Sequence, residues 1–236
     1  MSDFRRFFVS EMNGVIEGDE FYHGVSVLRI KDGDEIIVCD NSAYEYLAKV
    51  EKVNKKDFTY SIKEKRLSDT EAKTEVTLIA GYLKGDKTEL IVQKAVELGV
   101  KKIVVFSSKF SSAYMNDNKL SRLNRVSVEA SKQCGRAVAP SVEYAPDFES
   151  ALEFGASAKN KLFACEFGGE NRADLSSLEG STAIVVGSEG GFSVDERDLA
   201  IKKGYKVVYL GKRILRAETA AIALSAIVMQ ALKEFE

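Results

Sequence analysis

The chain contains only one histidine, His23, and three cysteines, and these small numbers exclude several kinds of catalytic site. A Cys/His zinc site or a serine–histidine triad would have to include His23, and neither spacing is present around it. Cys39, Cys134 and Cys165 are far apart, odd in number and never in a CxxC pair. We therefore expect no metal, a structural role for His23, and buried free thiols in a reducing, cytoplasmic setting.

A long apolar run is also absent. The longest one, residues 220–232, is interrupted by Ser225 and Gln230 and is too short to span a bilayer. The first residues, "MSDFRRFFVSEMNG", contain no apolar stretch typical of a signal peptide. We therefore expect no membrane association.

The net charge of −2 argues against a general polyanion binder, but the charge is unevenly distributed. Residues 1–70 hold 11 Lys or Arg against 14 Asp or Glu, whereas residues 81–140 hold 11 against 5. Such a local excess can hold a phosphate backbone on one face, and it is also typical of a solvated lysine-rich surface. Charge alone leaves both interpretations open.

The first seventy residues have the pattern of short strands separated by turns. "RRFFV", "DEIIVCD", "EYLAKVEKV" and "DFTYSIKE" are β-branched or aromatic, and "KDGD", "DNSA" and "NKKD" break them. This pattern predicts a small barrel or sandwich over residues 1–70. The polar segment 65–75 marks the expected domain boundary, and the second domain is expected over residues 74–236.

From Val76 onward, strands and helices alternate, which predicts an α/β fold with a parallel sheet covered by helices on both faces. One helix is expected to be capped by Asp86 and to run to Gly99, and a last helix is expected from Glu218 to Phe235. The expected strands are "VTLIAGYL", "KIVVFSS", "SVEYA", "KLFACEF", "TAIVVG" and "KVVYLG". Ligands of such sheets bind at the carboxyl ends of the strands.

Two glycine-containing segments follow strands at those carboxyl ends. In "AIVVGSEGGFSVDE" a strand enters a glycine bend, and Ser193 with Glu196 then forms the pattern of a helix capping box. In "LGKRILRAETAA" charged residues gather just before an apolar helix, which suits a charged ligand or reacting group. "GYLKGDKT" is a near miss to a P-loop, but Asp86 precedes Lys87 and would repel a phosphate, so nucleotide triphosphate chemistry is rejected.

Residues 117–134 form a predicted amphipathic helix with a mostly basic face. Polar and charged residues recur on it at spacings of three and four. Such a face suits phosphate contacts, although any solvated amphipathic helix has the same pattern. The residues of the stripe are Asn118, Arg122, Arg125, Glu129, Lys132 and Arg136.

Taken together, ordered segments along the whole chain resemble the SPOUT methyltransferases, and closely the bacterial ribosomal RNA small subunit methyltransferase E family. The family usually has proline where this chain has Ser188 and threonine where it has Ala217. The segments that carry the resemblance are "RRFFV", "HGVSVLRIKDGDEI", "KGDKTELIVQKAVELGV", "EASKQCGR", "GSEGGFS" with Glu196, and "LGKRILRAETA".

The resemblance implies a PUA-like N-terminal barrel that helps to bind RNA and a C-terminal parallel sheet tied in a deep trefoil knot, an exception to the rule that chains do not thread loops. It also implies a homodimer that uses S-adenosylmethionine (SAM) to methylate a uridine at N3 in 16S rRNA of the small ribosomal subunit. The cofactor-binding residues that it implies are Cys165, Glu166, Gly187, Ser188, Gly190, Gly191, Leu210, Gly211, Ile214, Leu215 and Thr219.

Under this interpretation the reaction requires a group that stabilises negative charge on the uracil ring and a group that takes the N3 proton. Arg216 is the candidate for the first role, and Glu218 and Glu189 are the candidates for orienting it or accepting the proton. The candidates for RNA contacts are Arg5, Arg6, Arg29, Lys84, Lys87, Lys94, Arg122, Arg125 and Arg136. The main alternative is a catalytically silent RNA- or ribosome-binding module, which would need no SAM affinity.

Overall fold

The computed structural model describes residues 5–110, 114–165 and 173–236. The chain divides into two compact units. The N-terminal unit comprises Met1–Glu71 and Ser131–Ala139, and the C-terminal unit comprises Ala72–Ala130 and Pro140–Glu236. Among the described residues, no helix is long and apolar enough to cross a lipid bilayer.

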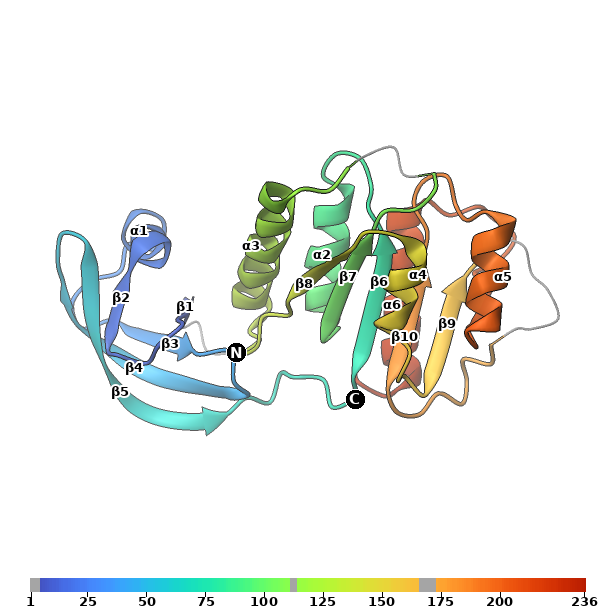
Figure 1. Cartoon of the computed structure of the whole chain (residues 1–236). Helices are drawn as coiled ribbons and strands as arrows, with labels where there is room; N and C mark the ends of the chain where they lie inside the picture. Colours follow the sequence, from blue (N-terminus) through green and yellow to red (C-terminus); the bar gives the residue numbers. More distant parts are fainter. Residues whose placement is uncertain (1–4, 111–113, 166–172) are drawn as a thin grey trace. The chain divides into compact units, whose positions relative to one another are not determined.

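The N-terminal unit is built on a five-stranded curled sheet with strand order β1-β3-β4-β5-β2 (Figure 1). Its core is aromatic and β-branched, with Phe7, Ile36, Val38 and Phe58 fully buried. Helix α1 packs against β2 and β5. The elements are β1 (Arg5–Phe8), β2 (Val15–Glu17), α1 (Gly18–Ser26), β3 (Glu35–Cys39), β4 (Tyr44–Val53) and β5 (Asp57–Leu67).

The four strands expected from the sequence are present, but β2 and α1 were not expected. Strand β2 has only three residues, and its backbone pairing with β5 is what defines it. Helix α1 begins at Gly18, whose φ of 63° lies in the left-handed region that glycine tolerates. Neither element is long enough to give a clear periodic pattern.

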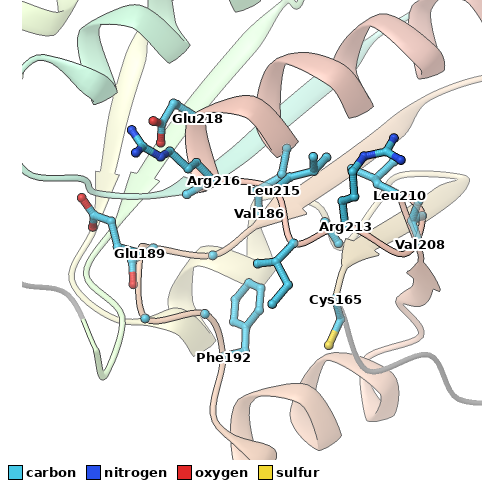
Figure 2. Close-up of a pocket in the computed structure, with 18 of the residues that line it drawn as sticks. Cys165, Val186, Glu189, Phe192, Val208, Leu210, Arg213, Leu215, Arg216 and Glu218 are labelled. Atoms are coloured by element: carbon cyan, nitrogen blue, oxygen red, sulfur yellow. The ribbon is translucent and has the colours of Figure 1, made fainter.

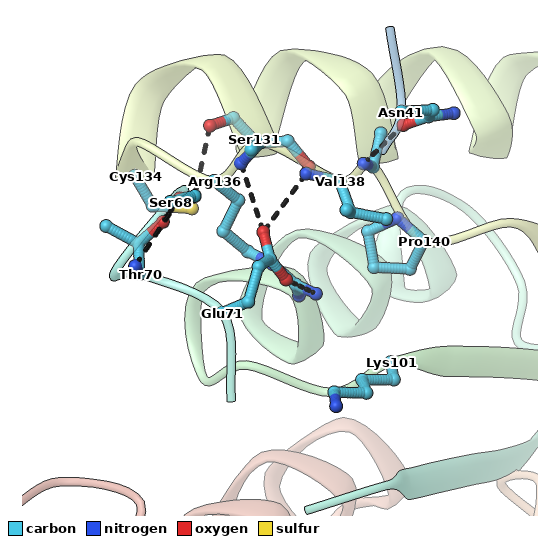
Figure 3. Close-up of polar contacts among 12 residues, drawn as sticks. Asn41, Ser68, Thr70, Glu71, Lys101, Ser131, Cys134, Arg136, Val138 and Pro140 are labelled. Carbon is cyan, nitrogen blue, oxygen red and sulfur yellow. Dashed lines mark hydrogen bonds and ion pairs between the residues drawn. The ribbon is translucent and has the colours of Figure 1, made fainter. Parts of the chain in front are cut away.

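A cluster of polar contacts around Glu71 ties Ser131–Ala139 into the N-terminal unit (Figure 3). The Glu71 carboxylate accepts hydrogen bonds from Arg136 Nη2 at 2.8 Å and Nε at 3.1 Å, and from the amides of Ala137 and Val138 at 3.0 Å each. Thr70 Oγ1 donates to the carbonyl oxygen of Gly135 at 2.9 Å. The expected boundary between residues 70 and 74 did not anticipate this second segment.

The C-terminal unit is built on a six-stranded sheet in which every pairing is parallel, as the alternation of strands and helices predicted. The strand order is β11-β9-β10-β6-β7-β8 (Figure 1). Its strands are β6 (Val76–Gly81), β7 (Lys102–Phe106), β8 (Val142–Ala145), β9 (Asn160–Ala164), β10 (Thr182–Val186) and β11 (Lys206–Val208), and its helices are α2 (Lys87–Glu97), α3 (Asp117–Cys134), α4 (Phe148–Glu153), α5 (Val194–Lys202) and α6 (Ala217–Ala231).

Both faces of this sheet are buried. Side chains alternate between the faces along each strand, so Ile79 and Val185 join one core with helix α4, whereas their neighbours Leu78 and Ile184 point the other way. Helix α6 packs on β6 and β10, and helix α2 packs on α6. Figure 1 shows α4 and α6 on opposite sides of the sheet. The trefoil knot that the family resemblance implies stays a prediction.

The sequence predicted the capping of helices α5 and α2, and the structure shows how these two and α4 begin. Ser193 and Glu196 form the predicted capping box of α5, with each side chain bonded to the backbone amide of the other residue. Asp147 caps α4 by accepting from the Ser150 amide at 2.8 Å. The prediction for Asp86 is wrong, because its side chain makes no capping hydrogen bond. Thr88 Oγ1 instead accepts a hydrogen bond from the Leu83 amide at 2.9 Å. Helix α2 also ends at Glu97, before Gly99.

Candidate active site

A pocket of about 440 Å³ lies where the chain leaves the carboxyl ends of three neighbouring strands, β9, β10 and β11. This is the position at which parallel sheets bind ligands. Figure 2 shows the side chains that surround it. The pocket is lined by Lys87, Ala164, Cys165, residues 186–192, residues 208–211, residues 213–218 and Ala220.

The segment Gly187–Gly191, which we call the glycine loop, leaves β10 and forms one wall of the pocket. Gly191 has a φ of 67°, and a Cβ atom at Gly190 would lie only 2.5 Å from Phe110 Cβ. The loop therefore requires glycine at these two positions. Ser188 is buried, and its hydroxyl lies 2.7 Å from the Ser108 hydroxyl, so its side chain is hydrogen-bonded to the loop that follows β7.

Glu189 extends from the glycine loop toward the start of α2. Its Oε1 accepts a hydrogen bond from the Lys84 amide at 3.1 Å and lies 3.5 Å from Lys87 Nζ. This carboxylate therefore links the segment after β10 to the segment after β6.

The segment from Leu210 to Glu218 forms the opposite wall. Gly211 turns the chain with a φ of 101°, and Ile214 is 84% exposed. Arg216 is the residue just before α6, and its side chain makes no hydrogen bond or ion pair with any residue in the described part of the chain. Glu218 Oε2 is buried and has no hydrogen-bond partner among those residues.

The two ends of the pocket differ in character (Figure 2). Arg216, Glu218 and Glu189 lie together at one end, whereas Cys165, Val208 and Leu210 lie at the other with Arg213. A molecule that fills the pocket would therefore have a polar, charged part at the first end and a flatter, more apolar part at the second.

Most of the predicted cofactor residues meet in this pocket. Thr219 is not among the lining residues and is exposed on α6, and Glu166 lies outside the described residues. The predicted residues that line the pocket are Cys165, Gly187, Ser188, Gly190, Gly191, Leu210, Gly211, Ile214 and Leu215, together with Glu189, Arg216 and Glu218.

Several lining residues were not among the predicted site residues: Ala164, Val186, Phe192, Val208, Tyr209, Arg213, Ala217 and Ala220. Phe192 packs against the Gly187 backbone, with ring atoms 3.0 Å from where a Cβ would be. A sequence signal was available for Phe192 and Tyr209, because each directly adjoins a predicted glycine bend or strand end.

The predicted RNA-contact residues differ in how exposed their side chains are. Arg29, Lys84, Arg122 and Arg125 are exposed. Arg5, Lys87 and Lys94 are partly exposed and lie beside the carboxylates of Asp34, Glu189 and Glu97 respectively.

The expectation for Arg6 and Arg136 is wrong. Arg136 has only 3% of its side chain exposed and is bound to Glu71, and Arg6 has 10% exposed and donates to Glu45 Oε2 at 3.1 Å. Guanidinium groups that are buried and paired in this way are not available to a phosphate backbone. Helical spacing placed Arg136 on the solvated face, but it lies beyond the last residue of α3, where that spacing no longer applies.

The described residues contain no group of three or more His, Cys, Asp or Glu side chains placed to hold a metal ion. The charged side chains that line the pocket are Lys87, Glu189, Arg213, Arg216 and Glu218.

Both units of the chain match models of known protein families. Residues 70–229 match the model of the RNA methyltransferase domain, and residues 16–63 match that of the RNA methyltransferase PUA domain. The ribosomal RNA small subunit methyltransferase E of Mesomycoplasma hyopneumoniae is 33% identical over 93% of this chain and 96% of its own length. The protein of that name from Bacillus subtilis is 32% identical over 91% of this chain and 89% of its own.

Among solved structures, a ribosomal RNA small subunit methyltransferase E from Neisseria gonorrhoeae, crystallised with S-adenosyl methionine, is 27% identical and superposes with a TM-score of 0.87. The match covers 97% of this chain and 98% of that one.

Proposed function

The chain belongs to the ribosomal RNA small subunit methyltransferase E family of RNA methyltransferases, and on this premise we propose that it transfers a methyl group from SAM to N3 of a uridine in 16S rRNA. The family resemblance expected from the ordered sequence motifs is thereby confirmed. The observation that carries the proposal is Glu218 Oε2, which lies beside Arg216 in a pocket at the ends of the parallel strands and is buried without a partner among residues 5–110, 114–165 and 173–236.

The pocket fits SAM in both shape and charge. A Cβ at Gly191 would meet no atom within 4 Å, so a ligand can approach the backbone of this wall closely. Val208, Leu210 and Leu215 offer apolar surface for an adenosine group. The unpartnered carboxylate oxygen of Glu218 is a suitable neighbour for a group that is cationic or carries a proton.

SAM supplies a methyl group already activated on a sulfonium cation, so this reaction needs no metal. The chain must bind the uracil ring, stabilise the charge that develops on it and receive a proton. N3 forms its bond to the methyl carbon as the bond between that carbon and the sulfonium sulfur breaks, and the N3 proton leaves to a carboxylate. As the proton leaves, negative charge spreads onto the flanking carbonyl oxygens. We assign the stabilisation of these oxygens to the Arg216 guanidinium and the acceptance of the N3 proton to Glu218.

The RNA is proposed to lie over the exposed basic residues, because phosphate contacts position a substrate without reading its sequence. Arg29, Arg122 and Arg125 are exposed, as is Lys84 at the start of the segment that contacts Glu189. The target uridine must leave its stack before its Watson–Crick edge can be attacked.

We further propose that the enzyme acts on the small ribosomal subunit, as a cytoplasmic homodimer. Helix α6 supports the second copy, because the apolar side chains of Ile222, Ala223, Ala226 and Ile227 remain partly or largely exposed on it. A helix that is apolar on its exposed face as well as its buried one is typical of an interface.

The first experiment is methyl transfer from isotopically labelled SAM to small ribosomal subunits that lack the modification, followed by nucleoside mass spectrometry. We expect labelled 3-methyluridine with the wild-type chain and none with Arg216→Ala that still binds SAM. SAM binding without transfer would contradict the substrate assignment. Absence of SAM binding would contradict the enzyme assignment and favour the catalytically silent RNA-binding module.

A further inference from the structure

We infer that Glu189 is a positioning residue that holds the glycine loop in its binding conformation, and that the two carboxylates of the pocket therefore have different roles. Glu189 fixes the loop, and Glu218 faces the reacting groups. The inference rests on the proposed function for the identity of the ligand, but the anchoring of the loop can be measured without that ligand.

The composition of the glycine loop makes such an anchor necessary. Of the five residues Gly187–Gly191, only Ser188 and Glu189 have side chains. Glycine loses more conformational entropy on ordering than any other residue, so this loop has little intrinsic preference for one conformation. Phe192 and Phe110 pack against its backbone, and any hydrogen bond or ion pair made by the loop's own side chains must come from those two residues.

Both side chains are engaged with segments that leave neighbouring strands. The Ser188 hydroxyl lies 2.7 Å from the Ser108 hydroxyl, after β7. Glu189 Oε1 accepts from the Lys84 amide at 3.1 Å and lies 3.5 Å from Lys87 Nζ, after β6. The loop is thus held from two sides, and its free backbone is left facing the pocket.

The contrast with Glu218 separates the roles of the two groups. One oxygen of Glu189 is already occupied by a backbone amide and lies beside an ammonium group. Glu218 Oε2 lies in the same pocket, buried and without a partner in the described part of the chain. A proton acceptor needs an oxygen that is not already engaged by another donor, and Glu218 Oε2 has no such donor among the described residues.

The backbone contact of Glu189 also determines which substitution is informative. Glutamine keeps an oxygen that can accept from the Lys84 amide but cannot act as a base, whereas alanine removes the acceptor. Glu189→Gln therefore preserves an anchor and abolishes a base, and Glu189→Ala abolishes both. Glu97→Ala is the matched control, because Glu97 pairs with Lys94 on the same helix α2 but does not line the pocket.

The experiment measures three quantities on each full-length variant: amide hydrogen exchange of residues 187–191 without ligand, the dissociation constant for SAM, and kcat as a function of pH. For Glu189→Ala we expect faster exchange in the glycine loop and SAM binding weakened by about tenfold, since the loop must be ordered on binding. We expect kcat at saturating substrates to remain within about threefold, with an unshifted pH profile.

Glu189→Gln is expected to restore slow exchange and to bring SAM affinity back to within about threefold of wild type. If Glu189→Gln instead lowers kcat by about a hundredfold or more and removes a limb of the pH profile, Glu189 is a catalytic base and the inference is overturned. It is also overturned if Glu189→Ala matches wild type and Glu97→Ala in loop exchange. Failure of the wild-type chain to bind SAM would count against the proposed function alone, because the exchange measurement still decides whether Glu189 anchors the loop.

Discussion

Buried carboxylates in the N-terminal unit and in the pocket of the C-terminal unit differ in their hydrogen-bond partners. In the N-terminal unit, Glu45 is buried and accepts from Arg6 at 3.1 Å and from Arg66 at 3.3 Å, and Glu71 is paired with Arg136. In the pocket, one oxygen of Glu218 is buried without a partner among the described residues.

This difference separates charges that maintain the fold from charges that await a ligand. A buried charge without a partner is unfavourable, so a carboxylate oxygen of this kind that also lines a pocket is a candidate for contact with a bound molecule. Glu45 and Glu71 are paired with arginines of their own unit. Glu20 Oε2 is also buried there without a partner among the described residues, but the other oxygen of that carboxylate pairs with Lys132 at 2.6 Å. Glu218 differs because it lines a pocket. Substitutions in the two places should therefore affect different measurements.

The largest effect is expected at Arg216. Arg216→Ala should lower kcat by about a thousandfold, because removal of one preorganised charge or donor from a transition-state site typically has an effect of about a hundredfold to a thousandfold. The midpoint of thermal unfolding should not change, since this side chain makes no hydrogen bond or ion pair in the described part of the chain. A lower unfolding midpoint with unchanged kcat would show that Arg216 maintains the fold and does not act on the bound molecule.

A large loss of stability, without a direct effect on chemistry, is expected at Glu71. Glu71→Ala leaves the Arg136 guanidinium buried without its carboxylate and should lower the free energy of unfolding by about 3–5 kcal/mol. Urea denaturation would measure this. The control is Glu179→Ala, because the Lys159–Glu179 pair is largely exposed and its loss should change stability by less than about 1 kcal/mol. Equal losses in the two variants would contradict the importance that we assign to burial.

A smaller effect is expected for an exposed cation of helix α3. Arg125→Ala should weaken binding to the RNA substrate severalfold. It should also reduce the slope of log K against log salt concentration by about one unit, the loss of one phosphate contact. Lys159→Ala, an exposed lysine that already lies beside Glu179, serves as the control. Binding titrations at several salt concentrations would test the proposal, and an unchanged salt slope for Arg125→Ala would remove this residue from the RNA-contact surface.

The smallest expected effect concerns Glu234, near the end of the chain. Burial raises the pKa of this carboxyl, but hydrogen bonds from Thr74 and Lys73 and the charge of Lys101 outweigh burial, so its pKa lies below the ordinary value of 4.5. A lowered pKa contributes stability that is present above about pH 4.5 and is lost as the pH falls through the folded-state value.

Glu234→Gln should therefore reduce the loss of unfolding free energy between pH 7 and pH 3, by about 1 kcal/mol or less. Denaturation at the two pH values would show the difference. A variant with the same pH dependence of unfolding free energy as wild type would show that the ionisation of Glu234 does not contribute to that dependence.

The sequence predicted best those features that depend on neighbouring residues. The capping box of Ser193 and Glu196 spans a single helical turn, and both of its hydrogen bonds are present. The glycine bends after β10 and β11 follow apolar strands directly, and both line the pocket. Strand and glycine patterns are local, so they can be read without knowing what packs against them.

The features that were missed depend on residues far apart in the sequence. Arg136 looked like part of an exposed basic stripe, but Glu71, 65 residues earlier in the chain, binds it in a buried site. Phe192 became a pocket residue because its ring packs under the Gly187 backbone. No periodicity in the sequence reports such pairings, since tertiary contacts decide them.

Ser188 illustrates how one departure from the family pattern can be accommodated. Where the family resemblance leads us to expect proline, this chain has a buried serine whose hydroxyl is hydrogen-bonded to Ser108. Proline restricts a loop through its own ring, whereas this serine restricts it through a partner on another segment.

The division of the N-terminal unit into two chain segments has a consequence for biosynthesis. Glu71 leaves the ribosome 65 residues ahead of Arg136, a delay of roughly 3–13 s at about 5–20 residues per second. Until Ser131–Ala139 emerges, the nascent first unit lacks the segment whose Arg136 pairs with Glu71. The unit whose sequence is translated first therefore completes its folding only after four of the elements of the second unit, β6, α2, β7 and α3, have been synthesised.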